Sequence, residues 1–473
     1  MITIQQNSIL QRVNALLYRP IYLVFIGGLT MLSNMFSLEL PVYTMFILIA
    51  AYVCLFARDL LPLLPLFICG YISPSRSNNP GINDASVFSL SGSGLYLGIL
   101  LLGVVFCLLY RIISDPDFGG RRFWSKKREL LSGMLILCST YAISGLGSGQ
   151  LPELGWRNLF FAFLQFLAIV GLYFLFTGGV RWDLAPKAYL FWTCTCVGYA
   201  LLFELLNLYV TAGVIVDGAI YRNNIYTGWG HYNNIGALFA MIIPMPFFLT
   251  GKGKYASFAY ISAILFYIGL IFTCSRGSIL FGTLIFISGY ILSLCHRQHA
   301  RRQYGIHFGA LATVVLGILF VEDEFSQLFK VFGEIGLGSS ARLRIYLQGI
   351  EQFVNYPVFG GSFFPVDADI FSWSSSDAFV SFFPPRWHNT FVQLIATGGV
   401  VCLVAYVLHR IQTIRLFIKN YSDEKLFAAL SLLALLMTSL LDCHFFNIGP
   451  VLLYSATLAV VECQLGNNET RTI

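Results

Sequence analysis

A histidine and several arginines, set between long apolar runs, could together handle a charged substrate. Arg276 lies in Ser275-Arg276-Gly277-Ser278, Arg342 begins a segment with helical spacing, and His388 opens a later apolar run. A guanidinium is permanently charged and forks onto phosphate oxygens, whereas a neutral imidazole accepts a proton near neutral pH. These residue types favour a site for a lipid-linked diphosphate, with a histidine able to accept a proton.

Further polar and aromatic side chains are expected to line the same site. They are Arg222, Tyr232, Asn234, Arg344, Arg386 and Asn389. Taken singly, each has an ordinary explanation as a headgroup anchor, an interfacial residue or a helix cap. Their convergence on one face from distant parts of the chain favours a shared site. Because Arg342 and Arg344 fall on different sides of a helix, at most one of them should share that site with Arg276.

One pattern points instead to a metal. Asp367-Ala368-Asp369 is a D-x-D, the arrangement with which many glycosyltransferases hold a divalent cation, but no third carboxylate lies at a persuasive spacing. Cys443-His444 and Cys295-His296 lack further ligands. The chain has no nucleotide-binding or nucleophile-elbow motif. We therefore expect no metal and no cofactor.

Composition sets the class of protein that positions these residues. Apolar residues make up 57% of the 473, and charged residues only 11%, against about 25% in soluble domains. The eleven cysteines accompany apolar segments, so neither a disulfide framework nor a thiolate zinc site is expected. The basic residues lie in short loops between apolar runs and are not a nucleic-acid footprint. The fold class is predicted to be all-α, a polytopic transmembrane bundle.

Apolar runs long enough to cross a bilayer set the predicted topology, since a span needs about 20 apolar residues. The runs are 21–38, 41–57, 92–113, 130–147, 157–177, 188–212, 234–250, 256–274, 277–295, 305–321, 390–408, 426–442 and 447–464. The basic loops are 111–128, 252–254, 297–302 and 410–425. Under the positive-inside rule they are cytoplasmic together with the N-terminus, provided that the short run 60–72 also crosses. We expect about 12 to 14 spans, with both termini inside.

A long outer loop divides the chain. Residues 1–321 form the first set of spans, 322–389 the extracytoplasmic loop, and 390–473 the last spans with a short cytoplasmic tail. Within the loop, the segment from Ser339 and Ser340 to Tyr356-Pro357 keeps helical spacing and predicts an amphipathic helix at the membrane surface. Loops of this length are uncommon without a role.

At these residues the chain resembles the O-antigen ligase and polymerase superfamily. The resemblance rests on Ser275-Arg276-Gly277-Ser278, on Ser340-Ala341-Arg342 with Asn355-Tyr356-Pro357-Val358-Phe359-Gly360-Gly361, and on His388-Asn389-Thr390-Phe391 with Gly398-Gly399-Val400. It covers about residues 220–450. Tyr346 stands where a tryptophan is common, and Gly360-Gly361-Ser362 replaces Gly-x-Gly, which leaves the sub-family open.

The resemblance implies a metal-independent glycosyltransferase of the bacterial inner membrane with its site on the periplasmic side. It would move a glycan from undecaprenyl diphosphate to a hydroxyl of a second glycan or of a lipid core. Carried over by residue, Arg276 and Arg342 would bind the diphosphate and His388 would activate the hydroxyl. Membrane lipids and other envelope polysaccharide assembly proteins are the partners it implies, and nucleic acid is not.

Two other classes of function stay open. A flippase or transporter would suit the span count, although the halves of this chain are not alike and its charge gathers at the outer rim. A non-catalytic scaffold for envelope assembly is the third hypothesis. The sequence does not separate a polymerase from a ligase.

Overall fold

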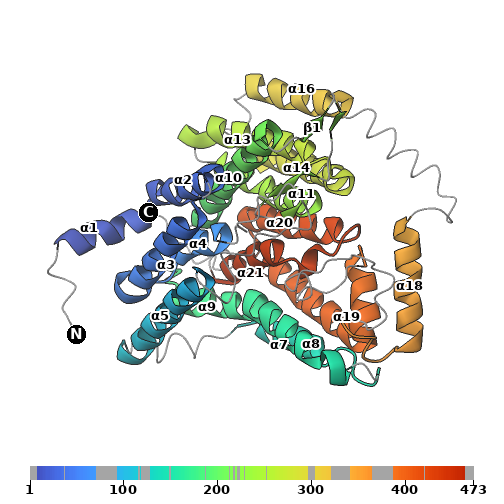
Figure 1. The fold of residues 1–473 in the computed structure, drawn as a ribbon. Coiled ribbons are helices and arrows are strands. Elements are labelled where there is room, and N and C mark those ends of the chain that lie inside the picture. The colour runs from blue at the N-terminus through green and yellow to red at the C-terminus, as the bar shows by residue number, and fades with distance from the viewer. Residues whose placement is uncertain are drawn as a thin grey trace.

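The fold comes from a computed structural model of the chain. It describes residues 8–463 except 37, 71–92, 116–117, 119–127, 149–150, 187, 212–213, 217–218, 221–223, 228–229, 252, 297–303, 321–340, 365–386 and 420. Helices dominate, and they surround a buried centre made by α11, α20 and α21 (Figure 1).

The first half of the chain forms a series of helices, several of them long and apolar as predicted. They are α1 (Ser8–Leu17), α2 (Pro20–Phe36), α3 (Glu39–Phe56), α4 (Leu63–Cys69), α5 (Ser93–Ser114), α7 (Leu131–Ala142), α8 (Leu151–Phe166), the π-helical turn η4 (Leu167–Gly171), α9 (Leu172–Gly179) and α10 (Tyr189–Thr211). Two short antiparallel hairpins follow α10. They pair β1 (Ile215–Val216) with β2 (Ala219–Ile220), and β3 (Tyr226–Thr227) with β4 (Gly230–His231).

The second half carries the residues singled out for chemistry. Its helices are α11 (Tyr232–Ile242), α12 (Pro244–Leu249), η6 (Gly253–Tyr255), α13 (Ala256–Phe272), α14 (Arg276–His296), α16 (Tyr304–Phe320), α18 (Ala341–Asn355), α19 (Thr390–Ile418), α20 (Asp423–Thr438), η9 (His444–Phe446) and α21 (Ile448–Cys463). Every residue of α11 and α12 is buried, so this pair forms the core against which α14 and α20 pack.

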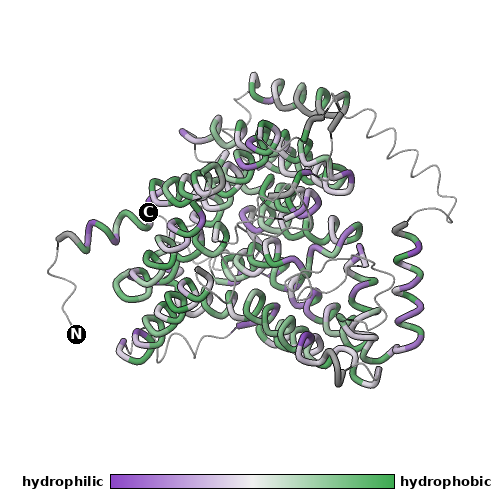
Figure 2. Tube along the Cα trace, viewed as in Figure 1, coloured by the Kyte–Doolittle hydropathy of each residue, from purple (hydrophilic) through white to green (hydrophobic). Residues whose placement is uncertain are grey.

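The all-α membrane class is confirmed. Eight helices within the described residues are long and apolar enough to cross a membrane, or nine if the pair α1 and α2, bent by 73°, is one span. Other predicted runs form shorter apolar helices, among them α7 and α21. Figure 2 shows hydrophobic residues along almost all of these helices. The all-helical arrangement satisfies backbone groups internally, as a bilayer requires.

Two predicted boundaries differ from the structure. The run 60–72, expected to cross, holds only the seven-residue helix α4, which is about 10 Å long and too short to span hydrocarbon alone. The run 390–408 extends to Ile418, because Arg410 and Arg415 continue the helix instead of opening a loop. Arg410 is accommodated by aromatic rings, its guanidinium carbon lying 4.6 Å from the Tyr406 centroid and 4.7 Å from that of Phe445.

Helix α19 contains a break that explains the paired glycines. Gly399 has φ 65°, outside helical geometry. A Cβ there would lie 2.3 Å from the Val358 carbonyl oxygen, and one on Gly360 would lie 2.2 Å from the Thr397 carbonyl carbon. The loop after α18 therefore packs backbone against backbone on the break, and side chains at these two positions would separate them.

The predicted loop helix is present as α18, at the edge of the bundle beside α19 (Figure 1). The expected caps Ser339 and Ser340 lie outside the described residues. Figure 2 shows that α18 carries more hydrophilic positions than the helices beside it, which agrees with a helix at the edge of a membrane rather than within it.

Candidate active site

His388 stands on a backbone turn that several groups hold in place. Its φ is 51°, and extended Asn389 follows it and caps α19 by accepting from the amides of Phe391 and Val392. The Asn389 amide donates to the Leu440 carbonyl over 2.8 Å, and the Tyr346 hydroxyl donates to the His388 carbonyl over 3.0 Å. A non-glycine residue with positive φ persists only when its surroundings fix it. The position of His388 is therefore determined by α18, α19 and the turn after α20.

A buried carboxylate stands behind the imidazole. Asp442 Oδ1 lies 3.5 Å from His388 Nδ1, at ion-pair distance but without the alignment of a hydrogen bond. Asp442 is 4% exposed, and its Oδ1 also accepts from the Cys443 amide over 2.7 Å. A carboxylate facing one ring nitrogen favours the proton on that nitrogen. Nε2, on the opposite side of the ring, is then the nitrogen that can accept a proton.

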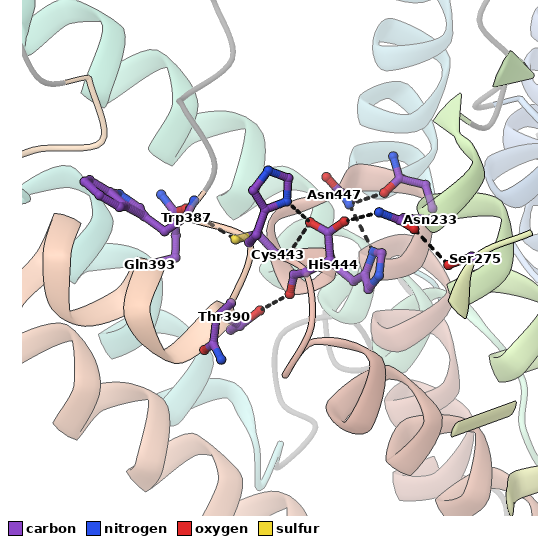
Figure 3. Close-up of polar contacts among 12 residues, drawn as sticks. Asn233, Ser275, Trp387, Thr390, Gln393, Cys443, His444 and Asn447 are labelled. Carbon is purple, nitrogen blue, oxygen red and sulfur yellow. Dashed lines mark hydrogen bonds and ion pairs between the residues drawn. The ribbon is translucent and has the colours of Figure 1, made fainter. Parts of the chain in front are cut away.

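Hydrogen bonds continue from Asp442 into the helix pair α11 and α14. Asn233 Nδ2 donates to Asp442 Oδ2 over 2.9 Å, and Ser275 Oγ donates to Asn233 Oδ1 over 2.8 Å (Figure 3). Ser275 Oγ is also 3.0 Å from Ser278 Oγ. This series of polar contacts thus runs from His388 through Asp442 and Asn233 to Ser275, the residue before Arg276. Segments distant in sequence form one connected polar site.

The motif around Arg276 has a specific role for each residue. Ser275 and Ser278 lie against α11, where a Cβ on Gly236 would be 2.7 Å from the Ser278 Cβ. A Cβ on Gly277 would be 2.6 Å from Leu441 Cδ1, so the motif also packs on the turn that carries Asp442. Arg276 itself is half-buried and is the first residue of α14. A helix N-terminus carries partial positive charge, which adds to the guanidinium in favouring an anion.

The side-chain amides of Gln393 and Asn447 make hydrogen bonds on the two sides of the site. Gln393 Oε1 accepts from the Trp387 amide over 2.9 Å and from the Cys443 thiol over 3.4 Å, as Figure 3 shows. Asn447 donates to the Asn234 side chain and lies 3.4 Å from His444 Nδ1. Because these polar groups are buried and engaged with one another, the turn 442–447 is held in one conformation.

The structure brings together some of the predicted residues. His388, Arg276 and Asn389 belong to one connected region, and Asn389 acts there as a helix cap. Asn234 is buried and bonded to Asn447, and Tyr232 is buried with its ring 3.6 Å from that of His231.

Of the other arginines predicted to bind substrate, Arg344 is described fully and position 342 only in its backbone. Position 342 lies four residues before Tyr346 on α18 and so shares its helical face, although the Arg342 side chain is outside the described set. Arg344 is exposed and lies on another face. Arg222 and Arg386 are outside the described residues, as are Asp367 and Asp369.

Asp442 and Asn233 belong to the candidate site but were not selected from the sequence. Asp442 closes an apolar run, and a carboxylate at a membrane helix end is unusual enough to mark a site. Asn233 lies between Tyr232 and Asn234, which were predicted to line the site, but was not itself predicted to do so. Neither signal reveals that the two side chains form a hydrogen bond, because the packing of α11 on α20 is what brings them together.

The described part of the site offers a histidine, a carboxylate, and amide and hydroxyl side chains. Among the described residues, no three or more His, Cys, Asp or Glu side chains are grouped so as to hold a metal ion. Cys443 is committed to Gln393, and all eleven cysteines are free thiols.

Comparison with models of protein families gives a match over part of the chain. Residues 261–407 match the family model described as O-Antigen ligase. The matched segment runs from α13 through α18 to the middle of α19, and so includes Arg276, position 342 and His388. No curated protein matches the chain.

Proposed function

We propose that this chain, which carries an O-antigen ligase domain over residues 261–407, is a glycosyltransferase acting on lipid-linked glycans. The predicted resemblance to the O-antigen ligase and polymerase superfamily is confirmed by that match. The donor we propose is a glycan on undecaprenyl diphosphate. The acceptor is a hydroxyl of a second glycan or of a lipid core.

One observation carries the proposal, the pairing of His388 with Asp442 beside the N-terminus of α14. The carboxylate lies 3.5 Å from Nδ1, so Nε2 is the basic nitrogen of the ring. The polar chain through Asn233 connects this base to the segment that carries Arg276. This connection supports a site in which a proton acceptor and an anion-binding helix end act together, as transfer from a diphosphate requires.

The proposed reaction is a direct displacement. His388 Nε2 takes the proton of the acceptor hydroxyl as its oxygen forms a bond to the anomeric carbon of the donor sugar. The bond from that carbon to the diphosphate oxygen breaks, and its electron pair leaves with the diphosphate. Arg276 and Arg342 stabilise the charge that develops on the leaving group. A diphosphate leaves without being protonated, so one base suffices.

The remaining predicted residues receive graded roles. Arg222, Arg344 and Arg386 are proposed to bind substrate at the rim, and Tyr232 to border the acceptor. Asn389 and Asn234 are proposed to support the site through the hydrogen bonds they make. We place the protein in the inner membrane with this site on the periplasmic side, working without metal alongside other polysaccharide assembly proteins.

A gene deletion with analysis of surface glycan tests the function. Loss of long chains while single repeats remain attached to core indicates a polymerase. Loss of all attachment, with carrier-linked polymer accumulating, indicates a ligase. Surface glycan that is unchanged in length and attachment would contradict the proposal. Complementation with Arg276→Ala should fail, although the variant still inserts in the membrane.

A further inference from the structure

The amphipathic helix α18 presents three faces with different chemistry. At about 100° per residue, Leu347, Ile350 and Val354 fall on one face, and Arg344, Gln348, Glu351 and Asn355 fall on the next. Tyr346, Gly349 and Gln352 occupy the third. Such a division into apolar, polar and packed faces is typical of a helix lying along a membrane boundary.

The packed face is tied to the active site. The Tyr346 hydroxyl donates to the His388 carbonyl, and a Cβ on Gly349 would be 2.9 Å from the Trp387 ring. Gln352 donates to the Ala396 carbonyl over 2.9 Å, at the broken turn of α19. These contacts fix the rotation of α18 about its axis, so the direction of its other faces is also fixed.

The apolar face of α18 is left uncovered by the described chain. Leu347 is 56% exposed, Ile350 43% and Val354 68%. Val358, just beyond the helix, is 50% exposed. Large apolar side chains aligned in this way mark a surface that contacts another apolar phase.

The exposed apolar residues of α18 lie next to those of a membrane span. The Val400 amide donates to the Pro357 carbonyl and the Val401 amide to the Val358 carbonyl, so Val358 lies beside the start of the second half of α19. From there the exposed apolar residues of α19 are Val400, Val404, Val407, Leu408, Ile411, Ile414 and Ile418. On a helix that crosses the bilayer these side chains face lipid. The uncovered face of α18 therefore ends, at Val358, beside this lipid-facing surface.

We propose that α18 is seated in the outer leaflet, with Leu347, Ile350, Val354 and Val358 among lipid acyl chains and the Arg344 face toward water. The occupant of this face is the bilayer itself. Through Tyr346 the helix then holds His388 at the depth of the lipid headgroups. The seating concerns the membrane and stands whether or not the chain transfers glycan.

Fluorophore quenching in the full chain tests the seating. The variants are Leu347→Cys and Val354→Cys, with Asn355→Cys as the matched control on the polar face, each in a Cys295→Ser background because Cys295 is the exposed cysteine. Each variant is labelled with an environment-sensitive maleimide dye and reconstituted in phosphatidylcholine vesicles. The labels at 347 and 354 should lose most of their emission to lipids brominated on the acyl chains. The label at 355 should instead be quenched by aqueous iodide.

Two outcomes would overturn the proposal. Iodide quenching at 347 and 354 equal to that at 355 would show that the apolar face of α18 is in water. Quenching by brominated lipid that appears only after removal of bound polyprenyl diphosphate would assign the face to the prenyl chain of a ligand. Since Leu347→Cys and Val354→Cys are separate variants, the proposal can still be tested with one of them if the other fails to fold. A transfer assay on the same vesicles separates failure of the seating from failure of the proposed function.

Discussion

Asp442 Oδ1 lies 3.5 Å from His388 Nδ1, although α19 and α20 separate the two residues along the chain. The carboxylate is buried and is held by the Cys443 amide and by Asn233. The histidine backbone is held by Tyr346 and by the cap of α19. Both partners are thus fixed before any substrate arrives, which is the preorganisation that a general base requires.

Replacing the carboxylate by an amide should impair the base without removing it. Asp442→Asn keeps the shape of the side chain but no longer favours the proton on His388 Nδ1. We expect transfer to fall by about 10- to 100-fold, as for other partners that orient a functional histidine. The rate of glycan transfer by purified protein measures this. Glu351→Gln, the same change at an exposed position of α18, is the control and should keep full activity.

Removing the hydroxyl of Ser275 should loosen the connection between the base and the arginine helix. Ser275→Ala leaves the buried Asn233 Oδ1 without its donor, at a cost of about 1–3 kcal/mol. Thermal unfolding in detergent should show a lower midpoint. Ser288→Ala, on the helix α14 that Ser275 directly precedes, is the control, because the Ser288 hydroxyl donates to the Leu284 carbonyl at an exposed position. Equal midpoints for both variants would show that the buried bond contributes nothing.

A methyl group at the break of α19 should disrupt the packing of the loop after α18. In Gly399→Ala the new Cβ would meet the Val358 carbonyl oxygen at 2.3 Å, and φ is 65°. Backbone strain alone costs about 1–3 kcal/mol, and the contact adds to it. We expect poor yield and a lowered unfolding midpoint. Gly103→Ala in α5 faces open space and should behave as wild type. A stable Gly399→Ala protein would mean that the break is not needed.

Arg410 should stabilise the fold through its planar guanidinium. It donates to the Tyr454 hydroxyl over 3.1 Å and lies over the rings of Tyr406 and Phe445. Arg410→Lys keeps the charge but loses the fork and the stacking, at about 0.5–2 kcal/mol. The unfolding midpoint should fall. Arg415→Lys, an exposed change on the same helix, should leave it unchanged. If the two variants have the same unfolding midpoint, the aromatic rings around Arg410 do not stabilise the fold.

Long, strongly apolar segments were predictable from the sequence, and local pairings across helices were not. The run 256–274 became α13 and the run 188–212 became α10, because apolar composition over a bilayer's thickness leaves helix as the available structure. The end of α19 was misplaced because Arg410 has the residue type of a loop. Inside the bundle it is accommodated by the rings of Tyr406, Phe445 and Tyr454 and by its hydrogen bond to the Tyr454 hydroxyl.

The site was predictable where motif and chemistry coincide. Arg276 and His388 were selected for charge and basicity. The structure connects their segments through two hydrogen bonds and the 3.5 Å approach of Asp442 to His388. Asp442 and Asn233 were missed because their significance lies in a contact between α11 and the turn after α20. Spacing along one helix carries no information about such a contact, which depends on how α11 packs on α20.

Reconstituted glycan transfer by His388→Ala tests the central claim most directly. Wild-type and variant protein are purified, shown to be equally folded, and supplied with an oligosaccharide on undecaprenyl diphosphate, an acceptor glycan and a metal chelator. The wild type should form the new glycosidic bond with the chelator present. The variant should be slower by about 10²–10⁴. Equal rates in the two proteins, or a wild-type rate that returns only with added divalent metal, would contradict the account.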